Sequence, residues 1–369
     1  MNSKSPSLVN AMTESACDTS LKNLEGMRDV PDHATSCVRS SNAVSVLIPT
    51  KNRPQDVLTC IRSVNKQSVQ PSEIIIVDAS DKKGLEALLI KNYGAETRIK
   101  YVPSEAGLTH QLNIGVRESS GDIVLVLDDD VILNEDYVQE ILKVFDNPCF
   151  DGIGCVFGEH IWPKKDTKHV GWGGALVGSM RRAPAVSINR LFKSRPFLAL
   201  FFLQGAATKT GKFRLSGFST YPSNPDASVY ETESAPGGFT AYYRKVLDEF
   251  QYDENLKGYA WGKDVDFSYR ISRKYKNICT AKAKVLHVSK TSKTANYAYS
   301  KMRIENHHYL FKKNFPQALT NRFAFNMSVL GLFLKELQFA AMAHSSQGVR
   351  GFLDGLRATH EKDSNKFSQ

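Results

Sequence analysis

The sequence is poor in cysteine and has no recognisable export signal at its start. Its six cysteines, among 369 residues, form no C-x-x-C pair and show no regular spacing, which argues against a disulfide framework. The N-terminus also lacks a basic region followed by an apolar run, so a secretory signal is not expected. We therefore predict reduced thiols in a cytoplasmic protein.

Apolar segments long enough to cross a bilayer are also missing. The run Pro196–Leu203 has eight residues, whereas a span needs about 20. The segment Met327–Ala343 is longer, but Lys335 and Glu336 lie in its middle, where ionised groups are costly in a membrane. We therefore predict a core or amphipathic helix there and no transmembrane span.

Acidic residues are absent from one long segment of this basic chain, whose net charge is +10. Residues 180–214 contain eight Lys or Arg and no Asp or Glu, and residues 290–369 contain twelve basic and five acidic side chains. Such patches suit an anionic membrane surface, a phosphorylated acceptor or nucleic acid. No zinc-finger, helix-turn-helix or aromatic RNA-binding signature accompanies them, so we predict no nucleic-acid partner. We predict instead peripheral binding at the inner face of the membrane, with Pro196–Leu203 contributing apolar contacts or packing in the core or in a dimer interface. Both a monomer and an oligomer are compatible with the sequence.

The first 42 residues lack sustained apolar periodicity and are rich in Ser, Asn, Asp and Thr, which is typical of a mobile leader. Short β-branched runs then alternate with helical patterns, a sequence that favours an α/β fold with a mainly parallel sheet covered by helices. The expected strands are Val44–Ile48, Ile74–Val77, Arg98–Val102 and Ile123–Leu127. The expected helices between them are one from Pro54, Gly84–Tyr93 and Leu108–Glu118.

The second half of the chain is less regular. Residues 158–235 show no clear periodicity, with short helices expected around Ile188–Leu203, and helices are expected to dominate from Tyr297 onward. Other expected elements are helices at Glu135–Phe145, Arg244–Phe250 and Gly262–Tyr275, and a strand at Ala283–Val288. We therefore divide the chain into a leader (1–42), an α/β domain (43–290, with halves 43–157 and 158–290) and a helical C-terminal extension (291–369).

Three consecutive acids, Asp128, Asp129 and Asp130, come directly after the fourth predicted strand. Parallel sheets bind ligands at the carboxyl ends of their strands, and two carboxylates spaced D-x-D can hold a hard divalent cation. Such a cation would neutralise the charge that builds up on a departing diphosphate. A solvated acidic turn that caps a helix is the alternative, and the position after a buried strand disfavours it.

Two other strand ends carry polar residues toward the same edge. The segment Ile48–Pro54 follows the first strand and Asp78–Asp81 follows the second. A carboxylate there can accept hydrogen bonds from a base or ribose, and Thr50 with its neighbouring backbone can frame the base. Each segment alone also fits an ordinary turn or helix cap. Together they predict one nucleotide-binding crevice.

The ordered set of these motifs resembles the family-two glycosyltransferases of the GT-A fold. The resemblance covers residues 44–290, and the combination is more specific than any one motif. The matching stretches are Val44–Pro54, Ile74–Asp81, residues 107–121 with Asn113-Ile-Gly115, Asp128–Asp130, Gly237–Arg244, Trp261–Arg270 and His287.

The resemblance implies a nucleotide-sugar donor site with a divalent metal, Mg²⁺ or Mn²⁺. It places Asp129 near the nucleotide sugar and makes Asp128 and Asp130 the two acids of the D-x-D, with Asp130 as the direct metal ligand and the register open by one residue. It makes His287 a ligand of the metal or of the diphosphate. The alternative is a structural role, which is common for a single histidine. The residues it assigns to the donor are Pro49, Thr50, Asn52, Arg53, Asp78, Asn113, Asp128, Asp129 and Gly238.

The resemblance also assigns the catalytic base. Asp264 stands where the family places a carboxylate that takes the acceptor's proton, although Lys263 replaces the common Glu before it. The alternative is that Asp264 and Asp266 are acids favoured by the helix dipole. Gly237 and Gly238 would let the backbone approach the sugar. Leu112 replaces a common Arg, so a phosphate contact is expected from Lys51, Arg53 or Arg303.

We therefore predict an inverting glycosyltransferase that moves a sugar from a nucleotide-sugar donor to a glycan or lipid-linked acceptor in cell-envelope or exopolysaccharide synthesis. A sugar-nucleotide nucleotidyltransferase is one alternative, but the loop Ile48–Pro54 contains no glycine to form a phosphate loop. A non-catalytic nucleotide-sugar-binding protein is another, favoured by Lys263 and Leu112 and opposed by the retained Asp264 and D-x-D. The missing Q-x-x-R-W motif argues against processive polysaccharide synthesis.

Overall fold

The computed structural model describes residues 42–82, 84–94, 98–161, 191, 194–203, 207–208, 211–224, 227–288 and 296–366. The predicted leader therefore lies almost entirely outside the described residues. The strands are β1 Val44–Thr50, β2 Glu73–Asp78, β3 Ile99–Pro103, β4 Ile123–Leu127, β5 Val131–Leu133, β6 Ile153–Ile161, β7 Ala207–Thr208, β8 Tyr221–Pro222, β9 Val229–Thr232, β10 Phe239–Tyr243 and β11 Lys276–His287. The helices are α2 Pro54–Val64, α3 Leu85–Tyr93, α4 Leu108–Glu118, α5 Tyr137–Phe145, α7 Arg195–Leu200, α8 Arg244–Glu249, α9 Lys263–Ser272, α10 Tyr297–Asn314, α11 Leu319–Ala343 and α12 Gln347–Lys366.

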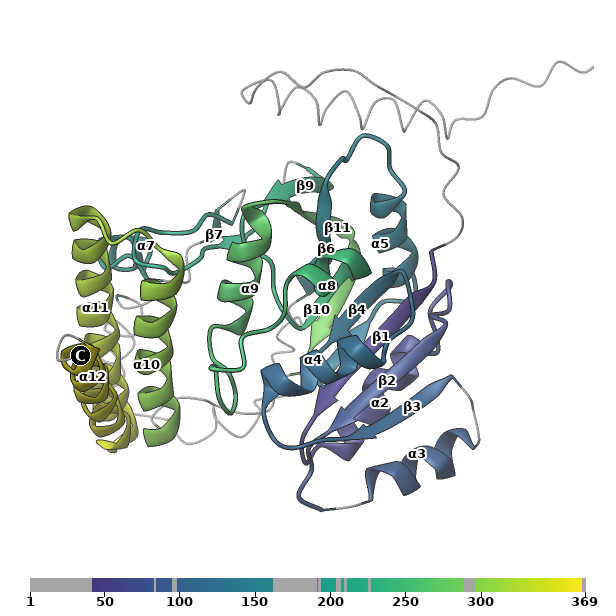
Figure 1. The fold of residues 1–369 in the computed structure, drawn as a ribbon, viewed down its shortest axis with the longest axis horizontal. Coiled ribbons are helices and arrows are strands. Elements are labelled where there is room, and N and C mark those ends of the chain that lie inside the picture. Colours follow the sequence, from purple (N-terminus) through teal and green to yellow (C-terminus); the bar gives the residue numbers. More distant parts are fainter. Residues whose placement is uncertain are drawn as a thin grey trace, which may run out of the picture.

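A nine-stranded mixed sheet forms the centre of the molecule (Figure 1). Its path is β3-β2-β1-β4-β10-β6-β11-β5, and β9 pairs with β11 beside this path. The strands β3, β2, β1 and β4 are parallel, whereas β10 runs antiparallel between β4 and β6. Every residue of β1 and β4 is buried, as expected for apolar strands covered on both faces. The predicted α/β fold with a mixed, mainly parallel sheet is confirmed.

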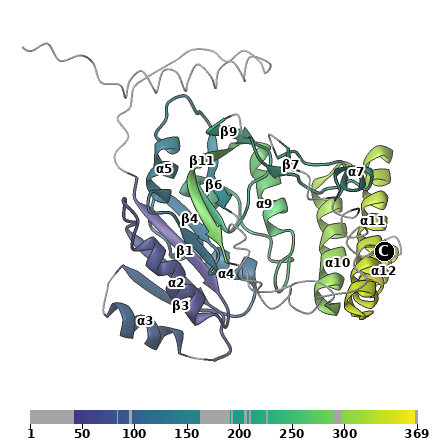
Figure 2. The same ribbon diagram turned by 180° about the vertical axis from the view of Figure 1, so that it is seen from behind.

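Helices cover both faces of the parallel half, with α4 on the front in Figure 1 and α2 on the side that Figure 2 shows. The approach of α4 to the sheet requires a glycine. A Cβ at Gly115 would lie 2.9 Å from Cγ of Leu47 on β1, which is closer than any ordinary contact. The predicted Asn113-Ile-Gly115 motif therefore sets how closely α4 packs against β1.

The helices α10, α11 and α12 stand side by side at the end of the molecule away from β3 (Figures 1 and 2). They have a core of their own, separate from that of the sheet, formed by Leu198, Phe201, Leu203, Phe218, Ile304, Leu332 and Phe352. The helical C-terminal region is confirmed, while the exact domain boundaries stay a prediction.

This second core also accounts for the apolar run Pro196–Leu203. Leu198, Phe201 and Leu203 are buried, and a Cβ on Gly331 of α11 would lie 2.5 Å from Cβ of Phe201. Of the contacts predicted for this run, core packing is therefore the one that these three side chains make. Most of the acid-free segment 180–214 lies outside the described residues. Among the helices that are described, none is long and apolar enough to cross a membrane.

Candidate active site

The acids after β4 lie at the edge of the sheet where β1 and β2 also end. β1 pairs in parallel with β4, with Leu47 opposite Val126, so the residues that follow both strands meet. Thr50, the last residue of β1, donates from Oγ1 to Oδ2 of Asp129 at 2.7 Å. The parallel register thus brings the predicted base-binding strand end and the predicted metal-binding acids into direct contact.

Asp129 lies on the side of this edge where β1 ends, which is the predicted nucleotide side. Besides Thr50, it receives a hydrogen bond from Nη1 of Arg53 at 3.0 Å, and the same guanidinium lies 3.3 Å from Oδ2 of Asp130. Burial raises the pKa of the Asp129 carboxyl to about 6, although the hydrogen bonds from Thr50 and Arg53 act in the opposite direction. Arg53 is therefore held among the acids, close to where a donor phosphate would approach.

Asp130 faces His287. The short strand β5, which the sequence did not reveal, pairs antiparallel with β11 and places Val131 opposite His287. The amide of Val288 donates to the carbonyl of Asp130 at 2.8 Å, and Nε2 of His287 lies 2.7 Å from Oδ1 of Asp130. Asp130 is thus held by the backbone of Val288 and faces the side chain of His287, which is 157 positions away in the sequence.

Asp128, Asp130 and His287 form a group that suits a divalent cation. One ligand atom from each residue lies within 4.8 Å of the other two. Burial raises the pKa of Asp128; the Lys263 ammonium lowers it, and the charges of Asp264 and Asp130 raise it further. A cation would relieve this crowding of acids, and two carboxylates with one imidazole are a donor set that Mn²⁺ or Mg²⁺ accepts. The predicted metal residues therefore fit the ion, whose identity stays open.

Gly237 and Gly238, which precede β10, connect this group to Asp264. The amide of Asp128 donates to the carbonyl of Gly238 at 2.8 Å. A Cβ at Gly238 would lie 2.5 Å from Cγ of Asp128, and a Cβ at Gly237 would overlap Oδ1 of Asp264. Both side chains thus lie against two consecutive peptide units, which places the D-x-D and the predicted base close together.

Asp264 is the second residue of α9, directly after Gly262 and Lys263. Gly262 has φ +90°, a left-handed conformation that favours glycine and turns the chain into the helix. Nζ of Lys263 forms an ion pair with Oδ1 of Asp264. The Asp264 side chain remains 42% exposed, so part of its carboxylate stays open to an incoming molecule.

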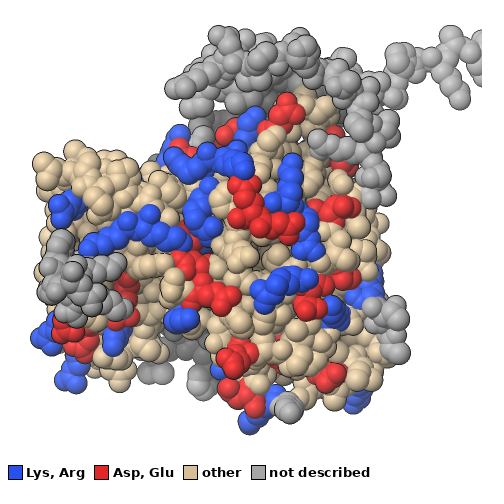
Figure 3. Space-filling view, in the orientation of Figure 1, with Lys and Arg blue, Asp and Glu red and all other residues tan. Residues whose placement is uncertain are grey.

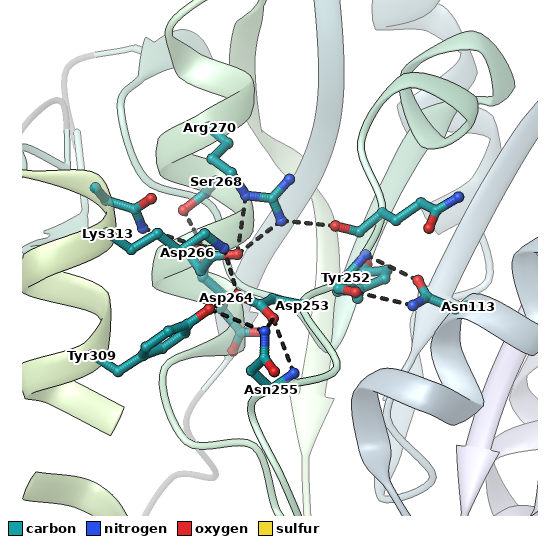
Figure 4. Close-up of polar contacts among 12 residues, drawn as sticks. Asn113, Tyr252, Asp253, Asn255, Asp264, Asp266, Ser268, Arg270, Tyr309 and Lys313 are labelled. Atoms are coloured by element: carbon teal, nitrogen blue, oxygen red, sulfur yellow. Dashed lines mark hydrogen bonds and ion pairs between the residues drawn. The ribbon is translucent and has the colours of Figure 1, made fainter. Parts of the chain in front are cut away.

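Asp266, two residues further along α9, has a different role. It is 1% exposed and binds Nε and Nη2 of Arg270 through Oδ2, at 3.0 and 2.8 Å. Its Oδ1 accepts from Lys313 and Asn314 of α10, both at 2.8 Å (Figure 4). Asp266 therefore anchors α9 to α10, whereas Asp264 packs against Gly237 and stays partly exposed.

The remaining nucleotide-side residues lie at the ends of β1 and β2. Pro49 and Thr50 pair with Val77 and Asp78. Asp78 is buried; Oδ1 accepts from the amide of Ser80 at 2.9 Å, and Oδ2 accepts from the hydroxyl of Tyr101 at 3.1 Å. Asn52 bonds Asp81 through Nδ2 at 2.8 Å. These contacts fix the strand ends, while donor binding by Pro49, Asn52 and Asp78 stays a prediction.

Two residues with predicted donor contacts are engaged elsewhere. Nδ2 of Asn113 donates to the carbonyl of Tyr252 and to Oε1 of Glu254, both at 2.9 Å, so it holds the segment before α9 (Figure 4). Arg303 of α10 binds Oε1 of Glu336 at 2.6 Å, and both side chains are largely buried. Lys51 lies 3.2 Å from Asp81, whereas Arg53 contacts Asp129 and Asp130, so Arg53 is the best placed of the three predicted phosphate contacts.

The sequence did not reveal several residues that shape the site. Nε2 of Gln111 donates to the carbonyls of Thr50 and Val77, at 2.8 and 2.9 Å, and so joins the ends of β1 and β2. The sequence signal that could have identified Gln111 is its place on the sheet-facing side of the predicted helix Leu108–Glu118. Tyr259 lies near Asp128 and Asp264, whose charges add to burial in raising the pKa of its phenol. No pattern in the sequence singles out this tyrosine.

The structure thus brings the parallel strand ends, the acid triplet and Asp264 together at one edge of the sheet, the arrangement expected for a GT-A donor site. Residues 45–208 match the sequence model of "Glycosyl transferase family 2", so this part of the chain is a family-two glycosyltransferase domain. The crystal structure of GalNAc-T7 with UDP, GalNAc and Mn²⁺ superposes with a TM-score of 0.51 at 15% identity, covering 84% of this chain and 57% of the other. That likeness confirms the GT-A fold.

Curated relatives match over a shorter range. An uncharacterized glycosyltransferase of Haemophilus influenzae is 28% identical over 106 residues, which cover 28% of this chain and 35% of the relative. The uncharacterized glycosyltransferase YwdF of Bacillus subtilis is 28% identical over 109 residues, which cover 29% of this chain and 40% of the relative. An N-acetylglucosaminyltransferase of Sinorhizobium fredii is 26% identical over 156 residues, which cover 39% of this chain and 37% of the relative. In each case the match spans at most two fifths of the relative's length.

Proposed function

We propose that the protein transfers a sugar from a nucleotide-sugar donor to an acceptor hydroxyl, with inversion at the anomeric carbon. The observation that carries this proposal is the placement of Asp264 directly across Gly237 and Gly238 from the Asp128–Asp130–His287 group. The donor diphosphate would thus bind next to Asp264, the group that takes the proton from the second substrate. Relatives named as glycosyltransferases support the same class of reaction.

On the donor side, Asp128, Asp130 and His287 would hold Mn²⁺ or Mg²⁺, which supplies charge neutralisation at the diphosphate. The structure with UDP, GalNAc and Mn²⁺ supports this choice of ion. The guanidinium of Arg53, 3.0 Å from Asp129 and 3.3 Å from Asp130, would contact a phosphate oxygen. The strand ends at Thr50 and Asp78 would hold the base and ribose.

On the acceptor side, the exposed part of the Asp264 carboxylate would take the hydroxyl proton. The acceptor oxygen would then bond to the anomeric carbon while the bond from that carbon to the diphosphate breaks. The products are the glycoside with inverted configuration, the nucleoside diphosphate and a proton on Asp264. A positioned general base contributes about 10²–10⁴-fold to such a step.

The test is a screen of nucleotide sugars with purified full-length protein, with Mn²⁺, with Mg²⁺ and with chelator. We expect release of nucleoside diphosphate that requires the ion and collapses in Asp130→Ala. Asp136→Ala, a change at an exposed acid outside the site, is the matched control. Release of pyrophosphate would favour a nucleotidyltransferase, and binding of a donor without any release would favour the non-catalytic alternative.

We further propose a glycan or lipid-linked acceptor of the cell envelope and peripheral binding at an anionic membrane surface. One side of α11 exposes Leu319, Phe323, Leu330 and Leu337, whose spacing places them along one stripe of the helix. The surface over α7 and the upper end of α11 carries little charge in Figure 3. The region 290–369, which includes α11, has a basic excess that complements anionic lipid.

A further inference from the structure

Lys263 is a buried cation inside the candidate active site. It is only 8% exposed, although it opens a helix and lysine is normally solvated. Burial alone would lower the pKa of its ammonium, but the charges of Asp264 and Asp128 outweigh burial and raise that pKa above its ordinary value. Lys263 therefore stays charged between the predicted base and a predicted metal ligand.

The backbone around Lys263 leaves little room for this ion pair to move. A Cβ at Gly237 would lie 2.7 Å from Nζ of Lys263 and would overlap Oδ1 of Asp264. Oδ1 is therefore confined between the ammonium and the peptide of Gly237. The side chain of Asp264 is still 42% exposed, so its other oxygen, Oδ2, is the one available to an acceptor hydroxyl.

Two other roles for Lys263 fit the structure less well. Its side chain is 9% exposed, which leaves no surface for binding an acceptor. It is also not needed to hold α9, because Asp266 anchors that helix to α10 (Figure 4). In addition, Asn306 donates to the carbonyl of Trp261, before the helix, at 2.9 Å. The contacts of Lys263 are directed instead at Asp264 and toward Asp128.

We propose that Lys263 is a positioning residue for sugar transfer: its ammonium fixes Asp264 through Oδ1 and leaves Oδ2 directed at the acceptor. The inference rests on the proposed function, since it concerns the same proton transfer. Without the ammonium, two neighbouring carboxylates repel each other, and Asp264 is free to rotate toward solvent. A displacement of about 1 Å at a reacting group costs about 10²-fold in rate.

The primary test replaces Lys263 by methionine, which keeps the length of the side chain and removes its charge. We expect kcat of Lys263→Met to fall by about 10²-fold, while the donor KM changes by less than about threefold. The Mn²⁺ concentration for half-maximal activity should not rise, because a cation beside Asp128 has been removed. Lys274→Met, at an exposed lysine paired with Glu249, is the control and should retain wild-type kcat.

A second variant keeps the test decisive if methionine impairs folding. In Lys263→Ala, propylammonium should restore part of the lost kcat in a saturable manner, which a purely structural defect would not allow. Wild-type kcat in Lys263→Met overturns the inference, and so does a kcat loss in Lys263→Ala that no alkylammonium of two to four carbons restores. Failure of the wild-type protein to transfer from any donor would refute the proposed function itself.

Discussion

The substitution Gly238→Ala isolates the contact between β10 and the D-x-D. Neither Gly237 nor Gly238 has a positive φ, so alanine meets no backbone strain at either position. The obstacle is steric, because the new Cβ would lie 2.5 Å from Cγ of Asp128, whereas ordinary contacts begin at 3.4 Å. The Asp128 carboxylate must therefore move by about 1 Å, away from its partners in the metal group.

The size of the effect follows from that displacement. A shift of about 1 Å in a positioned group costs about 10²-fold, so turnover should fall by about two orders of magnitude. The half-saturating Mn²⁺ concentration should rise, because one of three ligands has moved. Gly237→Ala should behave differently: its Cβ displaces Asp264 and Lys263, so kcat should fall while Mn²⁺ affinity stays near the wild-type value.

The assay combines Mn²⁺ titration of donor turnover with calorimetric Mn²⁺ binding to the free protein. Gly107→Ala is the control, because a Cβ there meets only Cβ of His110 at an ordinary 3.4 Å and the residue lies outside the site. Equal Mn²⁺ affinity in Gly238→Ala and the wild-type protein would refute the placement of Asp128 in the metal group. A kcat unchanged in Gly237→Ala would refute the packing of Asp264 against β10.

Three further predictions concern the base, pH and the membrane. Asp264→Asn should lower kcat by about 10²-fold or more with donor affinity intact in calorimetry, because the amide cannot take a proton. Burial would raise the pKa of Asp253, but hydrogen bonds from Lys313, Tyr309 and the Asn255 backbone lower it to about 2. The stabilisation of the fold by the ionised Asp253 is therefore complete above pH 3.8 and is lost as pH falls toward 2. In urea unfolding, Asp253→Asn should be less stable than the wild-type protein by about 1–2 kcal/mol at pH 6, after allowance for solvent screening. At pH 3 the difference should be about half as large. In flotation with anionic vesicles at low salt, the wild-type protein should bind and the double variant Phe323→Ser with Leu330→Ser should not, because the apolar contact is lost.

Each of these predictions has an outcome that contradicts it. Near-normal kcat in folded Asp264→Asn would mean that another group accepts the proton. A stability difference for Asp253→Asn that does not shrink between pH 6 and pH 3 would assign the effect to packing rather than to charge. For the membrane, Ile90→Ser on α3, a residue 60% exposed at the other end of the molecule, is the control, and flotation unaffected by salt would exclude an electrostatic contribution.

The parallel half of the sheet could be predicted because its signals are local. The runs Ile74–Val77 and Ile123–Leu127 are uninterrupted β-branched or leucine segments, and β2 and β4 occupy them almost residue for residue. β10 and β5 escaped prediction for a physical reason. Phe239–Tyr243 mixes aromatic residues with Thr and Ala over five residues, and Val131–Leu133 has three residues, so each is a strand only because of pairing partners distant in sequence.

The site shows the same division between local and long-range information. Which acids are present follows from the sequence, and their position after a buried strand locates the crevice. The inward direction of Lys263 does not follow, because lysine at a helix start is ordinarily solvated, and here the charges of Asp264 and Asp128 beside the backbone of Gly237 make its buried position favourable. The two departures from the family pattern therefore differ: Leu112 is a buried core residue, whereas Lys263 is part of the site.

The register of the acid triplet illustrates how pairing between distant strands assigns function to neighbouring residues. The three acids form the turn between β4 and β5, in which Asp128 and Asp130 lie with His287, whereas Asp129 lies against Thr50 at the end of β1. The sequence leaves open which side faces the cation. Pairing of β5 with β11 favours the side of Asp130, because it brings His287 to Asp130 at 2.7 Å, while Thr50 and Arg53 bond Asp129. Asp129, whose pKa burial raises to about 6, then joins the predicted base-binding strand end to the predicted metal group through its bonds with Thr50 and Arg53.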